Sequence, residues 1–258
     1  MSWEAKYGTA RAFVPSVDIS FNTKLLPFVL SVVAGAADII SFLGLGGLFT
    51  AHITGNLVIL AAHLVSGGTT QLAPMLSVPI FMISLGLTQL LAYGLEAIGQ
   101  ASMRPLLLLQ FILLAGSLVV SVSRPELDPS AGIAVAAGML GVSAMAVQNA
   151  LVHISLLGAP ATAVMTTNIT LLTMDISRLL VGGDPNDMAT ARRRAKRTWP
   201  AVVGFVVGCA LGAGCEMVAG LWSLALPAGL ALLALVLALA TKLDGAPGAS
   251  SRSSSPPT

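Results

Sequence analysis

Long runs without a charged residue constrain this chain more than any other feature. Four such runs cover residues 39–95, 105–123, 129–174 and 217–241. Because a bilayer-spanning helix needs about 20 mostly apolar residues, these runs can hold several crossings. Only 9% of the residues are charged, whereas a soluble domain has about one quarter. The sequence therefore predicts an all-α, multi-pass integral membrane protein and excludes a soluble domain, a disordered chain and a disulfide scaffold.

The hydrophobic segments predict two arrangements of helices. Eight segments are expected, at residues 25–47, 54–65, 75–98, 105–122, 131–157, 165–181, 200–219 and 221–241. The second and sixth are short for a full crossing. If they are broken or re-entrant, the chain has six full transmembrane helices; if they cross, it has eight. We favour six full helices and two short segments.

Basic residues predict the orientation of the chain in the membrane. Lys and Arg near membrane ends mark the cytoplasmic side, and one segment, 182–198, holds five of them: Arg192, Arg193, Arg194, Lys196 and Arg197. We expect a cytoplasmic loop at 182–198, a cytoplasmic amino-terminal segment at 1–24 and a disordered cytoplasmic tail at 242–258, in a plasma (inner) membrane. With a net charge of +2 and one short basic cluster, no nucleic-acid surface is expected.

A short polar motif occurs twice. Residues 50–56 read Thr-Ala-His-Ile-Thr-Gly-Asn, and residues 162–168 read Thr-Ala-Val-Met-Thr-Thr-Asn. Gly47 and Gly158 match in the same alignment, as do Asp38 and Asn149 when one residue is inserted. The chain is therefore interpreted as two homologous halves, 25–122 and 131–241. Six crossings make these halves inverted, and eight make them parallel.

The motif also carries a family resemblance. Gly-Ala-Ala-Asp at 35–38, Phe-Leu-Gly at 42–44 and the 50–56 motif, with Gln-Asn at 148–149, resemble the signature of the YoaK-like family of bacterial multi-pass membrane proteins. The likeness covers about residues 25–241. In the second half Thr167 stands where the first has Gly55. Because the family has no known function, the resemblance implies a membrane location and a transporter-like build, but no substrate.

Asp38 is the leading functional candidate. It lies deep within the first segment, where an ionisable side chain costs about 2.5–3.5 kcal/mol and marks a pathway or a paired site. It is interpreted as a proton carrier or cation ligand, with a structural hydrogen bond to a neighbouring helix as the alternative.

The repeated motifs are interpreted as helix starts inside the membrane. Thr54 and Asn56 are residue types that cap helix starts, and a helix that begins within the membrane directs its positive dipole end at a buried site. Transporters place such broken helices at matching positions of two repeats. The alternative is a tight turn at the membrane surface. The candidate pathway residues are Asp38, Thr50, His52, Thr54, Gly55, Asn56, Gln148, Asn149, Thr162, Thr166 and Asn168.

Other polar residues have simpler interpretations. Gln89, Gln110 and Gln148 line a cavity or join helices. Asp175 and Arg178, three residues apart on a helix, are expected to form a local ion pair.

The pattern as a whole favours a secondary transporter or permease for a small polar solute. One version of this hypothesis couples transport to protons through Asp38. The alternative is a membrane interaction or assembly protein without transport. No nucleophile–base pair, metal-ligand spacing or phosphate loop is present, so no enzyme activity, cofactor or metal is expected. The expected partners are the lipid bilayer and the solute. The sequence is also compatible with a homo-oligomer.

Overall fold

The described part of the chain is helical throughout. A computed structural model describes residues 22–66, 72–123 and 132–240. The predicted tail 242–258 and almost all of the predicted amino-terminal segment 1–24 lie outside these residues. No strand occurs within the described ranges, whose elements are α1 Asn22–Gly44, α2 Ile53–Ser66, α3 Leu72–Ala97, α4 Met103–Val122, α5 Gly132–Ser155, α6 Met165–Val181, α7 Pro185–Ala219, the 3₁₀ helix η2 Gly220–Leu224 and α8 Ala225–Ala240.

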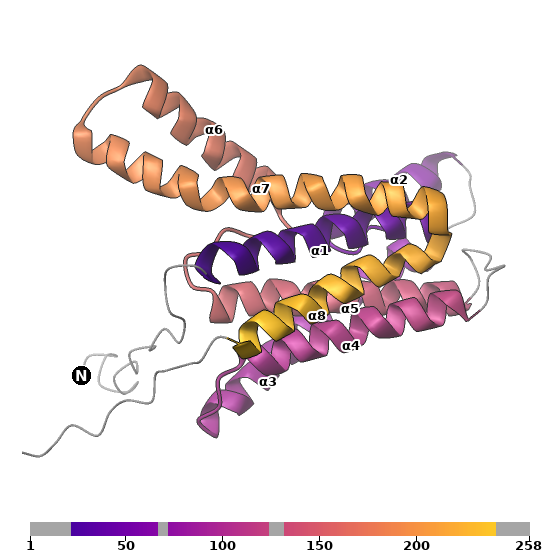
Figure 1. The fold of residues 1–258 in the computed structure, drawn as a ribbon. Helices are drawn as coiled ribbons and strands as arrows, with labels where there is room; N and C mark the ends of the chain where they lie inside the picture. Colours follow the sequence, from indigo (N-terminus) through magenta and orange to yellow (C-terminus); the bar gives the residue numbers. More distant parts are fainter. Residues whose placement is uncertain (1–21, 67–71, 124–131, 241–258) are drawn as a thin grey trace, which may run out of the picture.

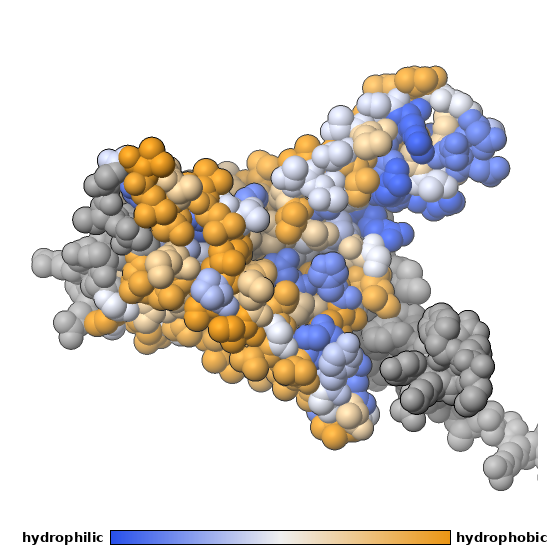
Figure 2. Space-filling model, turned by 180° about the vertical axis from the view of Figure 1, so that it is seen from behind, coloured by the Kyte–Doolittle hydropathy of each residue, from blue (hydrophilic) through white to orange (hydrophobic). Residues whose placement is uncertain are grey.

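The helices have the length and composition of membrane spans. Five stretches qualify, namely Leu25–Gly44, Leu72–Ala97, Met103–Val122, Gly132–Ser155 and Pro185–Ala240. The last contains α7, η2 and α8, and the chain reverses direction at η2 (Figure 1). Figure 2 shows apolar side chains over most of the bundle, with hydrophilic ones gathered on the α6–α7 hairpin and the adjoining end. These features confirm the all-α fold class and give five stretches that are long and apolar enough to cross a membrane, while the number of crossings stays a prediction.

The corresponding helices of the two predicted halves run in opposite directions. In Figure 1, α1 and α4 run towards the end where η2 lies, and α5 and α8 run back from it. In the first half α1 packs on α7 and α8, and in the second half α5 packs on α3 and α4. The short helices α2 and α6 pack on α3 and α7. Exchanging the two halves therefore reproduces the same set of helix pairs.

Small residues hold α1 and α7 close together. A Cβ added at Gly204, Gly208 or Gly35 would overlap backbone atoms of the facing helix, with Gly204 against Phe28 and Gly208 against Val32. Such close approach is typical of glycines in membrane helix pairs. The rising residue numbers on both sides show that α1 and α7 are parallel.

The structure corrects the predicted loop at 182–198. From Pro185 onwards this segment is the first part of α7, and with α6 it forms a hairpin that extends away from the bundle (Figure 1). The Asp184 side chain caps the helix by accepting bonds from the Asn186 and Asp187 N–H groups, and proline suits the first helical position. The high charge had suggested a loop, yet Arg, Lys and Ala all favour helix.

A second correction concerns Asp175. Its carboxylate is fully buried and pairs with Arg194 of α7, whose Nε lies 2.7 Å from Asp175 Oδ2 and whose Nη2 bonds Oδ1. The expected partner, Arg178, is exposed. Antiparallel packing of α6 on α7 brings Arg194, 19 residues further along the chain, to the buried carboxylate of Asp175.

Candidate functional site

Asp38 forms hydrogen bonds with the first of two loops that each join a long helix to a short one. Residues 45–52, here named the first clamped loop, join α1 to α2. Asp38 of α1 is 4% exposed, and its Oδ1 accepts the Ala51 N–H at 2.6 Å, the His52 N–H at 3.3 Å and the Thr50 hydroxyl at 3.4 Å. Its Oδ2 lies 3.6 Å from His52 Nδ1. The carboxylate thus sits at the start of α2, where backbone N–H groups favour negative charge.

An asparagine closes each loop by the same contact. Asn56, one turn into α2, accepts the Phe49 N–H at 2.9 Å and donates to the Phe49 carbonyl at 2.7 Å. Asn168, at the same place in α6, donates to the Ala161 carbonyl at 2.6 Å. Each asparagine reaches back seven residues. Residues 156–164, between α5 and α6, are therefore named the second clamped loop.

These contacts correct the predicted capping roles. Asn56 lies inside α2 and holds the loop before it, and Thr54 is exposed on α2. The start of α2 receives its carboxylate from Asp38 of the neighbouring helix. A cap supplied from another helix leaves no local sequence signal, which explains why the prediction placed it on Thr54 and Asn56.

Glycines shape both loops. Gly47 has φ +80° and Gly158 has φ +76°, a backbone region that glycine adopts without steric cost. Gly55 has a different role, because a Cβ there would lie 2.9 Å from the Phe49 ring. The second loop has the smaller Ala161 at the matching position and carries Thr167 in place of Gly55. In each motif a large side chain is therefore matched by a small one, Phe49 with Gly55 in the first and Thr167 with Ala161 in the second.

A glutamine supports the second clamped loop. Gln148 of α5 is fully buried, and its Nε2 donates to Thr162 Oγ1 at 2.9 Å and to the Leu30 carbonyl at 2.9 Å. The side chain of its neighbour Asn149, which the alignment matched to Asp38, donates to the Met145 carbonyl of its own helix. Gln148 therefore takes the position that the sequence had assigned to Asn149.

Each loop contributes one alanine to the same buried cluster in the interior of the bundle. Ala51 and Ala163, which occupy the same place in the two motifs, belong to one buried apolar cluster. Val33, Ala34 and Ala37 of α1 and Ala144 and Met145 of α5 complete it, with Leu114, Ala228 and Ala231. The structure thus unites Asp38, Thr50 and His52 around one loop and Gln148 with Thr162 around the other. Thr54 and Thr166 point to neither group and are exposed.

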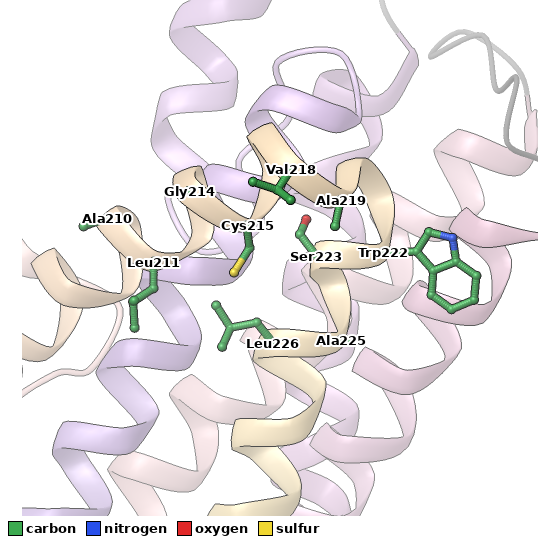
Figure 3. Close-up of a pocket in the computed structure, with 10 residues that line it drawn as sticks. All are labelled: Ala210, Leu211, Gly214, Cys215, Val218, Ala219, Trp222, Ser223, Ala225 and Leu226. Atoms are coloured by element: carbon green, nitrogen blue, oxygen red, sulfur yellow. The ribbon is translucent and has the colours of Figure 1, made fainter.

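An apolar groove lies elsewhere, where α7 turns into α8 (Figure 3). Cys215 and Leu226 face each other across it, and Ala210, Gly214 and Trp222 are among its lining residues. None of the candidate pathway residues lines this groove. Among the described residues, no group of three or more His, Cys, Asp or Glu side chains could hold a metal ion.

Sequence reasoning missed the contacts that define the loops. The Phe49 and Ala161 backbones and the Leu30 carbonyl carry no side-chain signal. Gln110 of α4 is the informative omission from the candidate pathway: it donates to Gln148 Oε1 at 2.7 Å and is fully buried. Its signal was an amide inside a charge-free run, which indicates an internal partner.

One family matches this chain. The model of a family described as "Protein of unknown function (DUF1275)" matches residues 26–237. The YoaK-like proteins are in that family, so the resemblance drawn from the motifs is confirmed. No curated protein and no solved structure matches.

Proposed function

This chain belongs to the DUF1275 family of unknown function, and on that premise we propose that it is a secondary transporter for a small polar solute, with its site between two inverted repeats. One observation carries the proposal. Two loops with the same asparagine contact follow helices of opposite direction, and Ala51 and Ala163 of these loops share one buried cluster. Transporters of the inverted-repeat type place broken helices at matching positions near the bilayer midplane.

The proposed proton carrier is Asp38 together with His52. Asp38 is nearly inaccessible, whereas 42% of the His52 side chain is exposed, and their nearest ring nitrogen and carboxylate oxygen are 3.6 Å apart. His52 titrates near neutral pH in its ordinary state. A proton entering at His52 would weaken the hold of Asp38 on the backbone of the first clamped loop, which links protonation to the position of α2.

Uptake into proteoliposomes tests transport. The full chain is reconstituted with and without a pH gradient and offered labelled amino acids, sugars, organic acids and small amines. We expect one class to enter faster than into protein-free vesicles. Asp38→Asn and Asn56→Ala should reduce that uptake by about tenfold or more, a loss of at least ~1.4 kcal/mol. Thr170→Ala, an exposed residue that bonds within α6, is the control and should retain it.

Side-specific labelling tests the inverted arrangement. Gln100, beyond α3, and Asn186, near the start of α7, are both exposed, and Figure 1 places the α3–α4 turn and the α6–α7 hairpin at the same end. Cysteines placed at these two positions, with Cys209 and Cys215 replaced, should react from the same side of the membrane. Six crossings require that result, whereas eight crossings put them on opposite sides.

A non-transporting assembly protein is the second candidate, because of the α6–α7 hairpin. The hairpin extends from the bundle and exposes apolar side chains at its tip, including Leu180 at 81% and Val181 at 88%. A protein that only transports a solute needs no such surface. Absence of uptake for every class, with retention of a protein partner that Leu180→Asp removes, would favour this alternative.

A further inference from the structure

A hydrogen-bonded network of neutral groups lies in the bundle interior. Gln148 donates to the Leu30 carbonyl and to Thr162 Oγ1, and its Oε1 accepts the Gln110 amide at 2.7 Å. Gln110 and Gln148 are fully buried, and Thr162 is 1% exposed. Four separate segments of the chain thus supply one group each, namely α1, α4, α5 and the second clamped loop.

In this network both ends of the Gln148 carboxamide have hydrogen-bond partners, whereas the buried carboxamide oxygen of Gln110, Oε1, has none among the described residues. A buried acceptor without a donor destabilises a protein by about 1–3 kcal/mol. An amide kept at this cost in an otherwise well-bonded network indicates that a donor from outside the chain occupies the position.

Gln110 lies on α4 next to the buried cluster that contains one alanine from each clamped loop. On α4, Gln110 lies one helical turn before Leu114, which belongs to the same buried cluster as Ala51 and Ala163. Leu106 and Leu107, on the other side of Gln110 along α4, are also fully buried. Water is therefore a poor competitor at this position, and a single hydrogen bond contributes more to recognition there than at the surface.

We propose that Gln110 Oε1 is a binding position for a neutral solute that donates an N–H hydrogen bond, such as a primary amide. This inference rests on the proposed function and specifies its substrate class. The open group is an acceptor, so the solute group must be a donor. Because the surrounding groups are amides, a hydroxyl and a carbonyl, a charged solute would lack a counter-ion in a buried environment.

Thermal unfolding of the purified full chain tests the inference without any need for transport. The probes are acetamide, acetate and methylammonium, which have similar size but differ in donors and charge. Acetamide should raise the unfolding midpoint by about 2–4 °C, the shift for a modest ligand linkage in a chain of this length. Acetate, which has no donor at neutral pH, should not, and neither should methylammonium.

Two variants in the same network provide the comparison. Gln110→Met removes the unpaired acceptor of Gln110 but leaves Gln148 Oε1 without its donor. Because one unpaired acceptor replaces another, the midpoint should stay within about 2 °C of the parent, while the response to acetamide disappears. Gln148→Met removes three bonds and should lower the midpoint by clearly more.

Three results would overturn the inference. The first is a Gln110→Met midpoint as low as that of Gln148→Met, which would mean that a structural water already fills the position. The second is an acetamide response that survives in Gln110→Met. The third is no response of the parent to acetamide, or an equal one to acetate. Acetamide binding without uptake in proteoliposomes would instead reject transport and leave the binding position in place.

Discussion

The first and second clamped loops share an asparagine contact but differ in what supports them. In the first, Asn56 bonds both backbone groups of Phe49, and the Asp38 carboxylate accepts two further backbone N–H groups. In the second, Asn168 donates to the Ala161 carbonyl and, at 3.8 Å, to Met165 Sδ, and the neutral Gln148 donates to Thr162. The fold therefore specifies the loop, while each half supplies its own electrostatics. The first loop is held by a carboxylate, and the second by a neutral amide.

Changing the charge of the two side chains that hold the loops, Asp38 and Gln148, should have the largest effect on the free energy of unfolding. Gln148→Glu puts a carboxylate beside the Leu30 carbonyl with no counter-ion, which should lower the free energy of unfolding by about 4 kcal/mol at neutral pH. Asp38→Asn keeps an acceptor for the Ala51 N–H and should cost about 2 kcal/mol. Denaturant titration of both variants measures the difference. Equal costs would show that the two supports are electrostatically equivalent.

Removing the arginine that pairs with Asp175 should have the next largest effect, confined to the second half. Arg194→Met leaves the buried Asp175 without a partner, and we expect a loss of about 3 kcal/mol. Adding Asp175→Leu should recover most of that loss. The exposed Arg193→Met is the matched control and should change stability by less than about 0.5 kcal/mol. Limited proteolysis of the hairpin reports the local opening.

The asparagine contacts should differ in strength. Asn56→Leu breaks two hydrogen bonds to Phe49 and should cost about 2 kcal/mol, whereas Asn168→Leu breaks one bond to a carbonyl and should cost about 1 kcal/mol. Thermal unfolding of the pair measures the ratio. A larger cost for Asn168 would reverse the ranking that the bond geometry predicts.

The threonines should show the smallest effect, with the opposite ranking. Thr162 accepts a 2.9 Å bond from Gln148, while Thr50 lies 3.4 Å from Asp38. Thr162→Val should therefore cost about 1 kcal/mol, and Thr50→Val less than about 0.5 kcal/mol. Unfolding midpoints of the two variants under identical conditions test this ranking, and equal values would contradict it.

The sequence predicted helix positions well and contacts between helices poorly. Segment 165–181 coincides with α6, which ends where Gly182 takes a positive φ. The match of Gly47 with Gly158 also reappears as a shared backbone conformation. By contrast, the partner of Asp175 and the support of Thr162 depend on which helices pack together. A charge-rich segment such as 185–198 was misread for another reason, since polarity was taken for irregular structure when the residue types favour helix.

The length of α7 has a mechanical consequence. Its 35 residues form one helix of about 52 Å that contains Pro200, packed closely on α1 at Gly204 and Gly208 and extending from the bundle at its beginning. About 28 Å of that helix lies between Gly204 and Pro185, so a tilt of about 10° at the glycine contact would move the hairpin tip by roughly 5 Å. A bend at Pro200 would move the tip without any change inside the bundle.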